Sequence, residues 1–316
     1  MTTDTNSLDL ARARLCVIMN LGSGRKDGAA VRRALHERLA PLCAEFELRE
    51  TEKGGDLVAM GRQAIADGFD VIAACGGDGT QSAIAGVLTG SDRVMMVLPG
   101  GTFNYFARDL GVGETIDEAL DRVAGATPRP IDVGDINGLI FLNNISLGAY
   151  PHILKTRERI YKRWGRSRIA AYWSVIKALR QLNRPMTVET LVGAERQRFT
   201  TALIFVARSA YQMESFGLDG ADAVRQGRFA VLIARARQPL PLMRSAFRLA
   251  FGLSAKDSDF DLIEADDLTI STDRTRPLVA HDGEKTRMEG PFHLKVRHGG
   301  LRVLCPEAPG PEGAPE

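Results

Sequence analysis

The chain has 316 residues, of which 25% are charged and 44% are hydrophobic, and its formal net charge is +2. This length suits two domains with a large buried core, and the composition is that of an ordinary soluble protein. No apolar run approaches the roughly 20 residues of a membrane-spanning helix, which excludes an integral membrane protein built from such helices.

The first part of the chain alternates short apolar runs with amphipathic stretches. Apolar runs that end in glycine or polar residues predict strands at 15–19, 46–49, 71–75 and 94–98. Apolar residues at helical spacing predict helices at about 27–39, 55–67 and 115–124, and two more after the strands at 71–75 and 94–98. This order predicts an α/β domain with a doubly wound parallel sheet.

Glycine-rich loops follow three of these strands. Their sequences are Asn-Leu-Gly-Ser-Gly at 20–24, Gly-Gly-Asp-Gly-Thr at 76–80 and Pro-Gly-Gly-Thr-Phe-Asn at 99–104. In a parallel sheet all three lie at the carboxyl ends of the strands, where α/β proteins bind ligands. Glycine lets the backbone approach a phosphate, and amides at the start of a helix face the anion. Together the loops predict a phosphate site, although each alone is also compatible with a plain turn.

Asp78 is the unusual member of the second loop. A carboxylate in a phosphate-binding loop repels the phosphate unless a cation lies between them. The conflict is resolved if Asp78 holds the magnesium ion of a nucleotide. With Asp78 and Thr80 added to the two glycines, at the end of a buried strand, the phosphate interpretation is favoured over a plain turn.

The pattern changes near residue 130. Strands are predicted at 128–136 and 139–145, joined by a hairpin at Asn137-Gly138. Further strands are predicted at 186–192, 197–206, 228–235, 267–272 and 292–297. Runs of strands without helices indicate an antiparallel sheet or sandwich. We therefore predict an α/β domain at 1–130, a β domain at 131–305 and a disordered Pro/Gly/Glu-rich tail at 306–316. The last strand or two could return to the first domain.

A basic segment at 154–184 interrupts the β pattern. It combines many Lys and Arg residues with Tyr and Trp, against the single acid Glu158. The pattern is typical of basic helices that bind an anionic membrane surface, or of a solvated helix pair whose aromatic residues pack on the sheet. Nucleic acid is not an expected partner, because no nucleic-acid-binding motif accompanies the charge. A second amphipathic helix, facing the core, is predicted at 241–251.

The cysteines and the N-terminus predict a cytoplasmic location. The four cysteines show no metal-type spacing, and Cys16 and Cys75 lie in apolar strand patterns. Buried thiols in a reducing compartment are therefore expected. The first residues, Met-Thr-Thr-Asp, lack the basic and apolar regions of a signal peptide.

A short acidic motif, His-Asp-Gly-Glu at 281–284, lies between two strand patterns. Asp-Gly at such a place is commonly a solvated hairpin tip. A carboxylate there could instead accept a hydroxyl proton during phosphoryl transfer, a reaction that otherwise needs positioning and charge neutralisation. Spacing alone does not separate these readings. His281 could be a ligand or a base, although a single histidine is more often a surface or packing residue.

Five motifs in order resemble the diacylglycerol kinase catalytic domain family, which includes sphingosine kinases and bacterial lipid kinases. They are the sequences at 20–24, 76–80, 98–110, 141–149 (Phe-Leu-Asn-Asn-Ile-Ser-Leu-Gly-Ala) and 281–284. The order and spacing hold from about residue 14 to 298. One motif alone would be unspecific, because NAD kinases and phosphofructokinases also carry Gly-Gly-Asp-Gly.

The resemblance implies an ATP-dependent lipid kinase with a Rossmann-like nucleotide domain and a β-sandwich domain. It implies that Glu284 accepts the proton, with Asp282 beside it, and that Asp78 orders the Mg²⁺ of the nucleotide. The expected partners are a lipid substrate and an anionic membrane surface contacted by 154–184, so the protein would be peripherally membrane-associated. The residues implied around ATP are Asn20, Gly22, Ser23, Gly24, Thr51, Gly76, Gly77, Asp78, Gly79, Thr80 and Thr102.

The sequence departs from the family pattern at several positions. Leu21 replaces a usual proline, and Tyr105 stands where many members have aspartate, which affects headgroup recognition or a polar network. The sequence Arg-Gln-Gly-Arg at 225–228 replaces an acidic metal loop, so a second metal site is not predicted. Two alternatives stay open: a kinase of a soluble acceptor such as NAD, and a non-catalytic nucleotide or lipid sensor that kept the fold.

Overall fold

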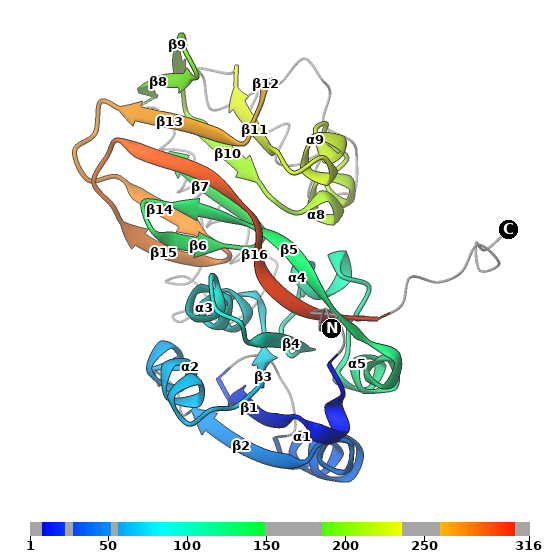
Figure 1. Ribbon diagram of the computed structural model, residues 1–316. Helices are drawn as coiled ribbons and strands as arrows, with labels where there is room; N and C mark the ends of the chain where they lie inside the picture. The colour runs from blue at the N-terminus through cyan, green and yellow to red at the C-terminus, as the bar shows by residue number, and fades with distance from the viewer. Residues whose placement is uncertain (1–7, 23–27, 52–55, 149–184, 236–259, 307–316) are drawn as a thin grey trace, which may run out of the picture. The chain divides into compact units, whose positions relative to one another are not determined.

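The computed structural model describes residues 8–22, 28–51, 56–148, 185–235 and 260–306. The chain packs into two units, one formed by residues up to Val133 together with those from Arg297 onward, the other by Gly134–Val296 (Figure 1). Several sequence predictions lie outside the described residues. These are Ser23, Gly24, the basic segment at 154–184, the helix at 241–251 and the tail beyond residue 306.

The first unit is built on a parallel sheet with the order β2-β1-β3-β4. Its central strands β3 and β4 are buried along their whole length, as their apolar sequences predict. The strands are β1 (Arg14–Asn20), β2 (Glu45–Thr51), β3 (Val71–Gly76) and β4 (Val94–Pro99). The helices are α1 (Gly28–Ala34), α2 (Leu57–Ala66), α3 (Asp78–Leu88), α4 (Tyr105–Asp109) and α5 (Ile116–Arg122). Shorter turns are η1 (Leu10–Arg12), the π-type η2 (Leu35–Leu39), η3 (Ala40–Leu42) and η4 (Val123–Gly125).

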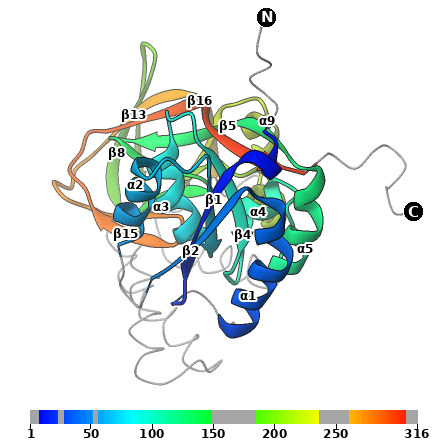
Figure 2. The ribbon, with the colours of Figure 1, turned by 60° about the horizontal axis from the view of Figure 1, so that its bottom comes forward.

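Helices cover both faces of this sheet, which confirms the doubly wound prediction. Figure 2 shows α2 and α3 on one side of the strands and α1 and α5 on the other. The α2–α3 contact is close because Gly61 presents no side chain: a Cβ there would lie 3.3 Å from Ile84. On the opposite face Arg38 of η2 bonds Asp117 of α5 at 3.0 Å.

The second unit is antiparallel throughout its described pairings. One sheet has the order β16-β13-β8-β9 and the other β12-β11-β10-β7-β14-β15, while β5 pairs with β6. The first strands are β5 (Thr127–Ile136), β6 (Leu139–Phe141), β7 (Asn144–Gly148), β8 (Met186–Val192), β9 (Glu195–Thr201) and β10 (Leu203–Ala207). The later ones are β11 (Phe229–Ala234), β12 (Phe260–Ala265), β13 (Asp267–Thr272), β14 (Leu278–His281), β15 (Glu284–Arg287) and β16 (Phe292–Cys305). The described residues of this unit also form two short helices, α8 (Ala210–Ser215) and α9 (Ala221–Arg225).

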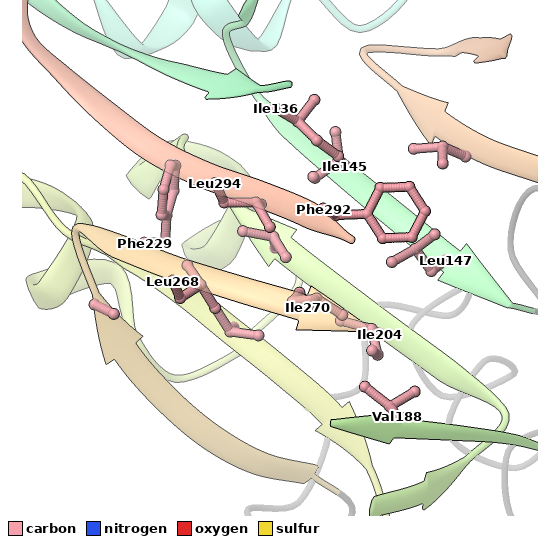
Figure 3. Close-up of a cluster of buried hydrophobic side chains, with 14 of the residues drawn as sticks. Ile136, Ile145, Leu147, Val188, Ile204, Phe229, Leu268, Ile270, Phe292 and Leu294 are labelled. Carbon is pink, nitrogen blue, oxygen red and sulfur yellow. The ribbon is translucent and has the colours of Figure 1, made fainter. Parts of the chain in front are cut away.

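The core of the second unit lies between its two sheets, as expected for a β-sandwich (Figure 3). Leu268, Ile270 and Phe292 contribute from one sheet, and Ile145 and Ile204 contribute from the other. A smaller apolar cluster packs α8 and α9 on the outer face of β10 and β11. Within the described ranges, no helix is long and apolar enough to span a membrane.

The predicted strand at 197–206 is wrong, because the chain changes sheets at Ala202. β9 pairs with β8 in one sheet, whereas β10 pairs with β7 and β11 in the other. The Thr201 hydroxyl stabilises the bend by donating to the Ala234 carbonyl at 2.8 Å. The strands β12, β14 and β15 and the helices α8 and α9 were not predicted, since each has only four to six residues.

The last strand extends well beyond its predicted end at 297. In the second unit β16 pairs antiparallel with β13, through Leu294 and Leu268 among others. In the first unit its later residues pair parallel with β4, where Val303 lies beside Met95. The C-terminal strand therefore does return to the α/β sheet, a point the sequence left open. The Asn137-Gly138 hairpin between β5 and β6 is confirmed.

Candidate nucleotide and catalytic site

The carboxyl ends of β1 and β3 are tied together by side chains. Asn20, the last residue of β1, donates from Nδ2 to the Thr80 Oγ1 in the first turn of α3 at 3.0 Å. The Asn20 Oδ1 accepts the Gly22 amide at 3.0 Å, which turns the first loop back on itself. Thr51 at the end of β2 is buried and pairs with Asn20 in the parallel register. These predicted site residues therefore lie together at one edge of the sheet.

The glycines of the second and third loops pack backbone against backbone. A Cβ on Gly100 would lie 2.8 Å from the Gly76 Cα, and one on Gly101 would lie 2.7 Å from the Gly77 Cα. The Gly100 amide also donates to the Gly76 carbonyl at 2.7 Å. The missing side chains thus let the two loops approach each other. The sequence predicted these glycines from the approach of a phosphate, and the packing of the loops is a second reason for them.

Helix α3 begins at Asp78, directly after the glycine pair. Its first turn is closed by the Thr80 and Gln81 amides, which both donate to the Gly77 carbonyl at 2.9 and 3.0 Å. Inside the protein, the Gln81 Nε2 donates to the Gly76 carbonyl at 3.2 Å and fixes the end of β3 to the helix. The positive end of the α3 dipole therefore points out of the carboxyl edge of the sheet, where an anion is stabilised.

Asp78 is half-buried, and α4 orients its carboxylate. The Asp78 Oδ1 accepts the Phe106 amide at 3.4 Å. The described residues hold no cluster of three or more His, Cys, Asp or Glu side chains that would bind a metal by themselves. Mg²⁺ is commonly held by one or two carboxylates together with substrate phosphates. A single oriented carboxylate beside a helix N-terminus fits a magnesium ion that arrives with a nucleotide.

The third loop is held by Asn104, to which the sequence analysis assigned no role. This residue is buried and has a left-handed backbone with φ of 51°. Its Oδ1 accepts the Gly101 amide at 2.8 Å, and its Nδ2 donates to the Glu114 carbonyl at 3.0 Å. The signal was available, because asparagine tolerates the left-handed region that such a loop requires.

The tip of the third loop faces solvent. Thr102 is exposed, and Phe103 is 52% exposed and stacks on Tyr105, with ring centroids 5.5 Å apart. A cavity of about 30 Å³ lies at the same edge of the sheet. Its lining comes from the ends of β1, β3 and β4 and from the two α-helices on one face: Met19, Asn20, Leu21, Gly28, Val31, Cys75, Gly76, Gly100 and Ile116.

In the second unit, the Asp-Gly of the acidic motif forms the two-residue turn between β14 and β15. Both turn residues have positive φ, 44° at Asp282 and 88° at Gly283, as a type I′ hairpin requires. Unlike a solvated hairpin tip, the Asp282 side chain is buried. Its carboxylate accepts the amides of Leu142, Asn143 and Asn144 at 2.7, 2.8 and 3.1 Å. These bonds fix the turn to the segment that leads into β7.

His281 and Glu284 are direct partners across the end of this hairpin. Glu284 is exposed, whereas His281 is half-buried, with Nε2 lying 3.2 Å from the Thr286 Oγ1. Burial lowers the pKa of the His281 imidazole, and the negative charges of Asp282 and Glu284 offset this only in part. The imidazole is therefore neutral near pH 7, whereas the Glu284 carboxylate is exposed to solvent.

A buried amide pair supports the same region from α8. The Asn144 Nδ2 donates to the Gln212 Oε1 at 2.8 Å, and the Arg208 amide donates to the Asn143 carbonyl at 2.7 Å. These contacts fix the segment whose amides hold Asp282. Sequence reasoning missed Gln212, because α8 was not predicted.

The N-terminal part of the chain matches a known family model. Residues 14–136 match the model of the diacylglycerol kinase catalytic domain. This range contains β1 to β5 and all three glycine-bearing loops.

Relatives extend the similarity over nearly the whole chain. A diacylglycerol kinase of Bacillus subtilis is 35% identical over 318 aligned positions, which cover 94% of this chain and 97% of that protein. A crystal structure of a diacylglycerol kinase from Bacillus anthracis superimposes with a TM-score of 0.71 at 21% identity, and covers 93% of this chain and 98% of that one. The structural likeness shows a shared two-domain fold.

Proposed function

The chain belongs to the diacylglycerol kinase family and is a kinase; from this premise we propose that it transfers the γ-phosphoryl group of ATP to a lipid hydroxyl. The observation that carries the nucleotide half of this proposal is the convergence of three loops at one sheet edge. There Asn20 donates to the Thr80 hydroxyl in the first turn of α3, and the Gly100 amide donates to the Gly76 carbonyl. Such an edge suits a polyphosphate.

The residues proposed to surround ATP come from four strand ends. Thr80 and the amides at the start of α3 would face the phosphates, and the exposed Thr102 would reach them from the third loop. The remaining residues of the proposed set are Asn20, Gly22, Ser23, Gly24, Thr51, Gly76, Gly77, Asp78 and Gly79. Asp78 would hold Mg²⁺, which when bound neutralises negative charge on the phosphates.

We assign the proton acceptor to Glu284. The acceptor hydroxyl would lose its proton to the Glu284 carboxylate while its oxygen bonds to the γ-phosphorus and the bond to the β–γ bridging oxygen breaks. The exposed carboxylate is open to a substrate, and the hairpin that carries it is fixed by the Asp282 hydrogen bonds. Asp282 acts through that hairpin and does not touch the reacting atoms.

A lipid acceptor is supported by the relative from Bacillus subtilis, which is named a diacylglycerol kinase. Diacylglycerol is therefore the first substrate to test, and sphingoid bases follow. The basic segment at 154–184 would bring the chain to an anionic membrane, where each basic residue contributes about 1 kcal/mol.

The direct test is turnover of ATP and a lipid by Glu284→Gln. This variant should lose lipid phosphorylation while it still binds ATP, because the amide cannot accept the proton. Glu289→Gln is a matched control, since Glu289 is an exposed carboxylate near the same hairpin that pairs with Arg276 at 3.2 Å. Full activity of Glu284→Gln would remove the assigned role.

The acceptor class needs a separate experiment. The chain would be incubated with ATP, Mg²⁺ and either diacylglycerol, sphingoid bases, monoacylglycerol, phosphatidylglycerol or NAD, and the products read by mass. A mass shift of one phosphoryl group on a lipid supports the proposal. A shift on NAD alone would favour a soluble acceptor, and no product with any acceptor would favour a nucleotide or lipid sensor.

A further inference from the structure

We propose that His281 is a positioning residue for Glu284, and that protonation of His281 switches the kinase off in mild acid. The inference rests on the proposed function, since it takes Glu284 as the proton acceptor. Its starting point is the register of the β14–β15 hairpin. A two-residue turn leaves no freedom in the pairing, so His281 and Glu284 must face each other across the strands.

The pair projects from one face of the sheet. Side chains alternate along a strand, so His281 lies on the same face as the buried Val279, two residues earlier. On the other side of β14, His281 pairs with Ile145 of β7, which belongs to the same core. Directly opposite side chains in antiparallel pairs have Cβ atoms about 5 Å apart. His281 and Glu284 therefore project from the same face of the hairpin as cross-strand neighbours.

The imidazole is fixed rather than free to rotate. Its Nε2 hydrogen-bonds with the Thr286 Oγ1 at 3.2 Å, and Thr286 lies on the same face of β15 as Glu284. The bond holds the ring on the face of the hairpin that also carries Glu284, whose side chain is exposed. A histidine with no role beyond covering the surface would need neither the Thr286 hydroxyl as a partner nor a half-buried position.

The charges around His281 determine what its protonation does. Among the described residues, Asp282 and Glu284 are the charged groups that act on it, and its neighbour on β7, Ile145, carries none. Both oxygens of Asp282 already accept backbone amides, so Glu284 is the carboxylate left to pair with an imidazolium. Burial lowers the pKa of the imidazole below 6.5, so that at neutral pH the ring is uncharged.

This arrangement gives the two protonation states different consequences. With a neutral ring, the Glu284 carboxylate can accept the proton of the lipid hydroxyl. With a protonated ring, the imidazolium pairs with the carboxylate, which makes it a weaker proton acceptor and draws it toward the hairpin. Turnover should therefore fall as His281 becomes protonated, at a pH set by the histidine.

The first test is the pH dependence of kcat for the full chain and for His281→Gln. The wild type should lose activity in the acid range below pH 6.5. In His281→Gln that acid limb should move down by about one pH unit or more, because the imidazolium that would pair with Glu284 is gone. His293→Gln is the matched control, since His293 also contacts a threonine hydroxyl, Thr269 at 3.1 Å, and faces no carboxylate across the strands.

A second test does not depend on activity. The His281 ring proton signal would be titrated by NMR in the wild type, in Glu284→Gln and in Glu289→Gln. The negative charge of Glu284 raises the pKa of His281, so Glu284→Gln should shift the midpoint to lower pH, whereas Glu289→Gln should leave it in place.

The two proposals fail in different ways. An unchanged acid limb in His281→Gln, with Glu284→Gln inactive, would overturn the inference and leave Glu284 as the base. A titration midpoint of His281 that is the same in Glu284→Gln as in the wild type would also overturn the inference. Full turnover by Glu284→Gln would instead remove the proposed base, whatever the titration shows.

Discussion

Asn20 donates a hydrogen bond to the side chain of Thr80 at 3.0 Å, and so joins the end of β1 to the first turn of α3. The two residues are 60 positions apart in the sequence and belong to different glycine-bearing loops. The bond fixes the spacing between two loops that we propose to face the same triphosphate. The proposed phosphate site would therefore depend on the whole sheet edge rather than on any single loop.

The Asn20–Thr80 bond predicts a nucleotide-binding defect. Thr80→Val keeps the shape of the side chain and removes the acceptor, so the KM for ATP should rise by about fivefold, the equivalent of one hydrogen bond. Thr89→Val is the control, because Thr89 lies at the other end of α3 and its hydroxyl donates to the Ala85 carbonyl. Equal KM values for the two variants would contradict the role of Thr80.

The backbone contact between the two glycine loops predicts a folding defect. Gly101→Ala would place its Cβ 2.7 Å from the Gly77 Cα, and neither backbone can move without breaking the loop. The free energy of unfolding should fall by about 2 kcal/mol or more, measured by urea denaturation. At Gly125, a Cβ meets nothing within 4 Å, so Gly125→Ala should be nearly neutral. If Gly101→Ala binds nucleotide and keeps the wild-type free energy of unfolding, the two loops tolerate a larger distance between their backbones.

The sequence allowed the sheet edge to be predicted because parallel strands are apolar and their ends carry glycine. It did not show that Gly100 and Gly101 make room for Gly76 and Gly77, because a contact between two loops leaves no periodic pattern. Asn104 was missed although asparagine suits a left-handed backbone, because its bond to the Glu114 carbonyl, 10 positions away, has no signature in the sequence.

In the second unit the limits of prediction have a different cause. The hairpin at Asn137-Gly138 was predicted because a two-residue turn has a local signature. The change of sheet at Ala202 was not, because no glycine or proline marks the boundary between β9 and β10 in the sequence. The sequence left open whether Asp282 lies at a solvated hairpin tip or in a catalytic site, because the amides that bury its carboxylate, such as that of Asn143, lie 139 positions away.

The buried carboxylate of Asp282 predicts a strong effect on stability. Asp282→Ala would leave the amides of Leu142, Asn143 and Asn144 without their acceptor, at a cost of about 3 kcal/mol in the free energy of unfolding. Asp267→Asn should change it by less than about 0.5 kcal/mol, because the Asp267 side chain is exposed and 3.8 Å from Lys295. Similar stability of the two variants would show that the three amides find other partners.

The lowered pKa of His281 predicts a pH-dependent stability. Since burial holds the folded pKa below the ordinary value of 6.5, the unfolded chain takes up a proton more readily between those two values. The contribution of His281 to the free energy of unfolding should therefore be complete above pH 6.5, and it should fall as the pH decreases toward the folded pKa. His281→Gln should flatten this part of the profile in urea titrations on both sides of pH 6.5. A slope that persists in the variant would assign it to other groups.

The cysteines predict an order of chemical labelling in the native protein. Burial raises the pKa of Cys16 and of Cys305 to about 11, so near pH 8 only about one thousandth of either thiol is ionised. Cys43 is only half-buried, although burial raises its pKa as well, so it should react first with a maleimide. Cys43→Ser should remove the early labelling seen by mass spectrometry, and denaturant should expose the remaining thiols. Rapid labelling of Cys16 or Cys305 in the native state would mean that β1 or β16 opens far more often than their complete burial implies.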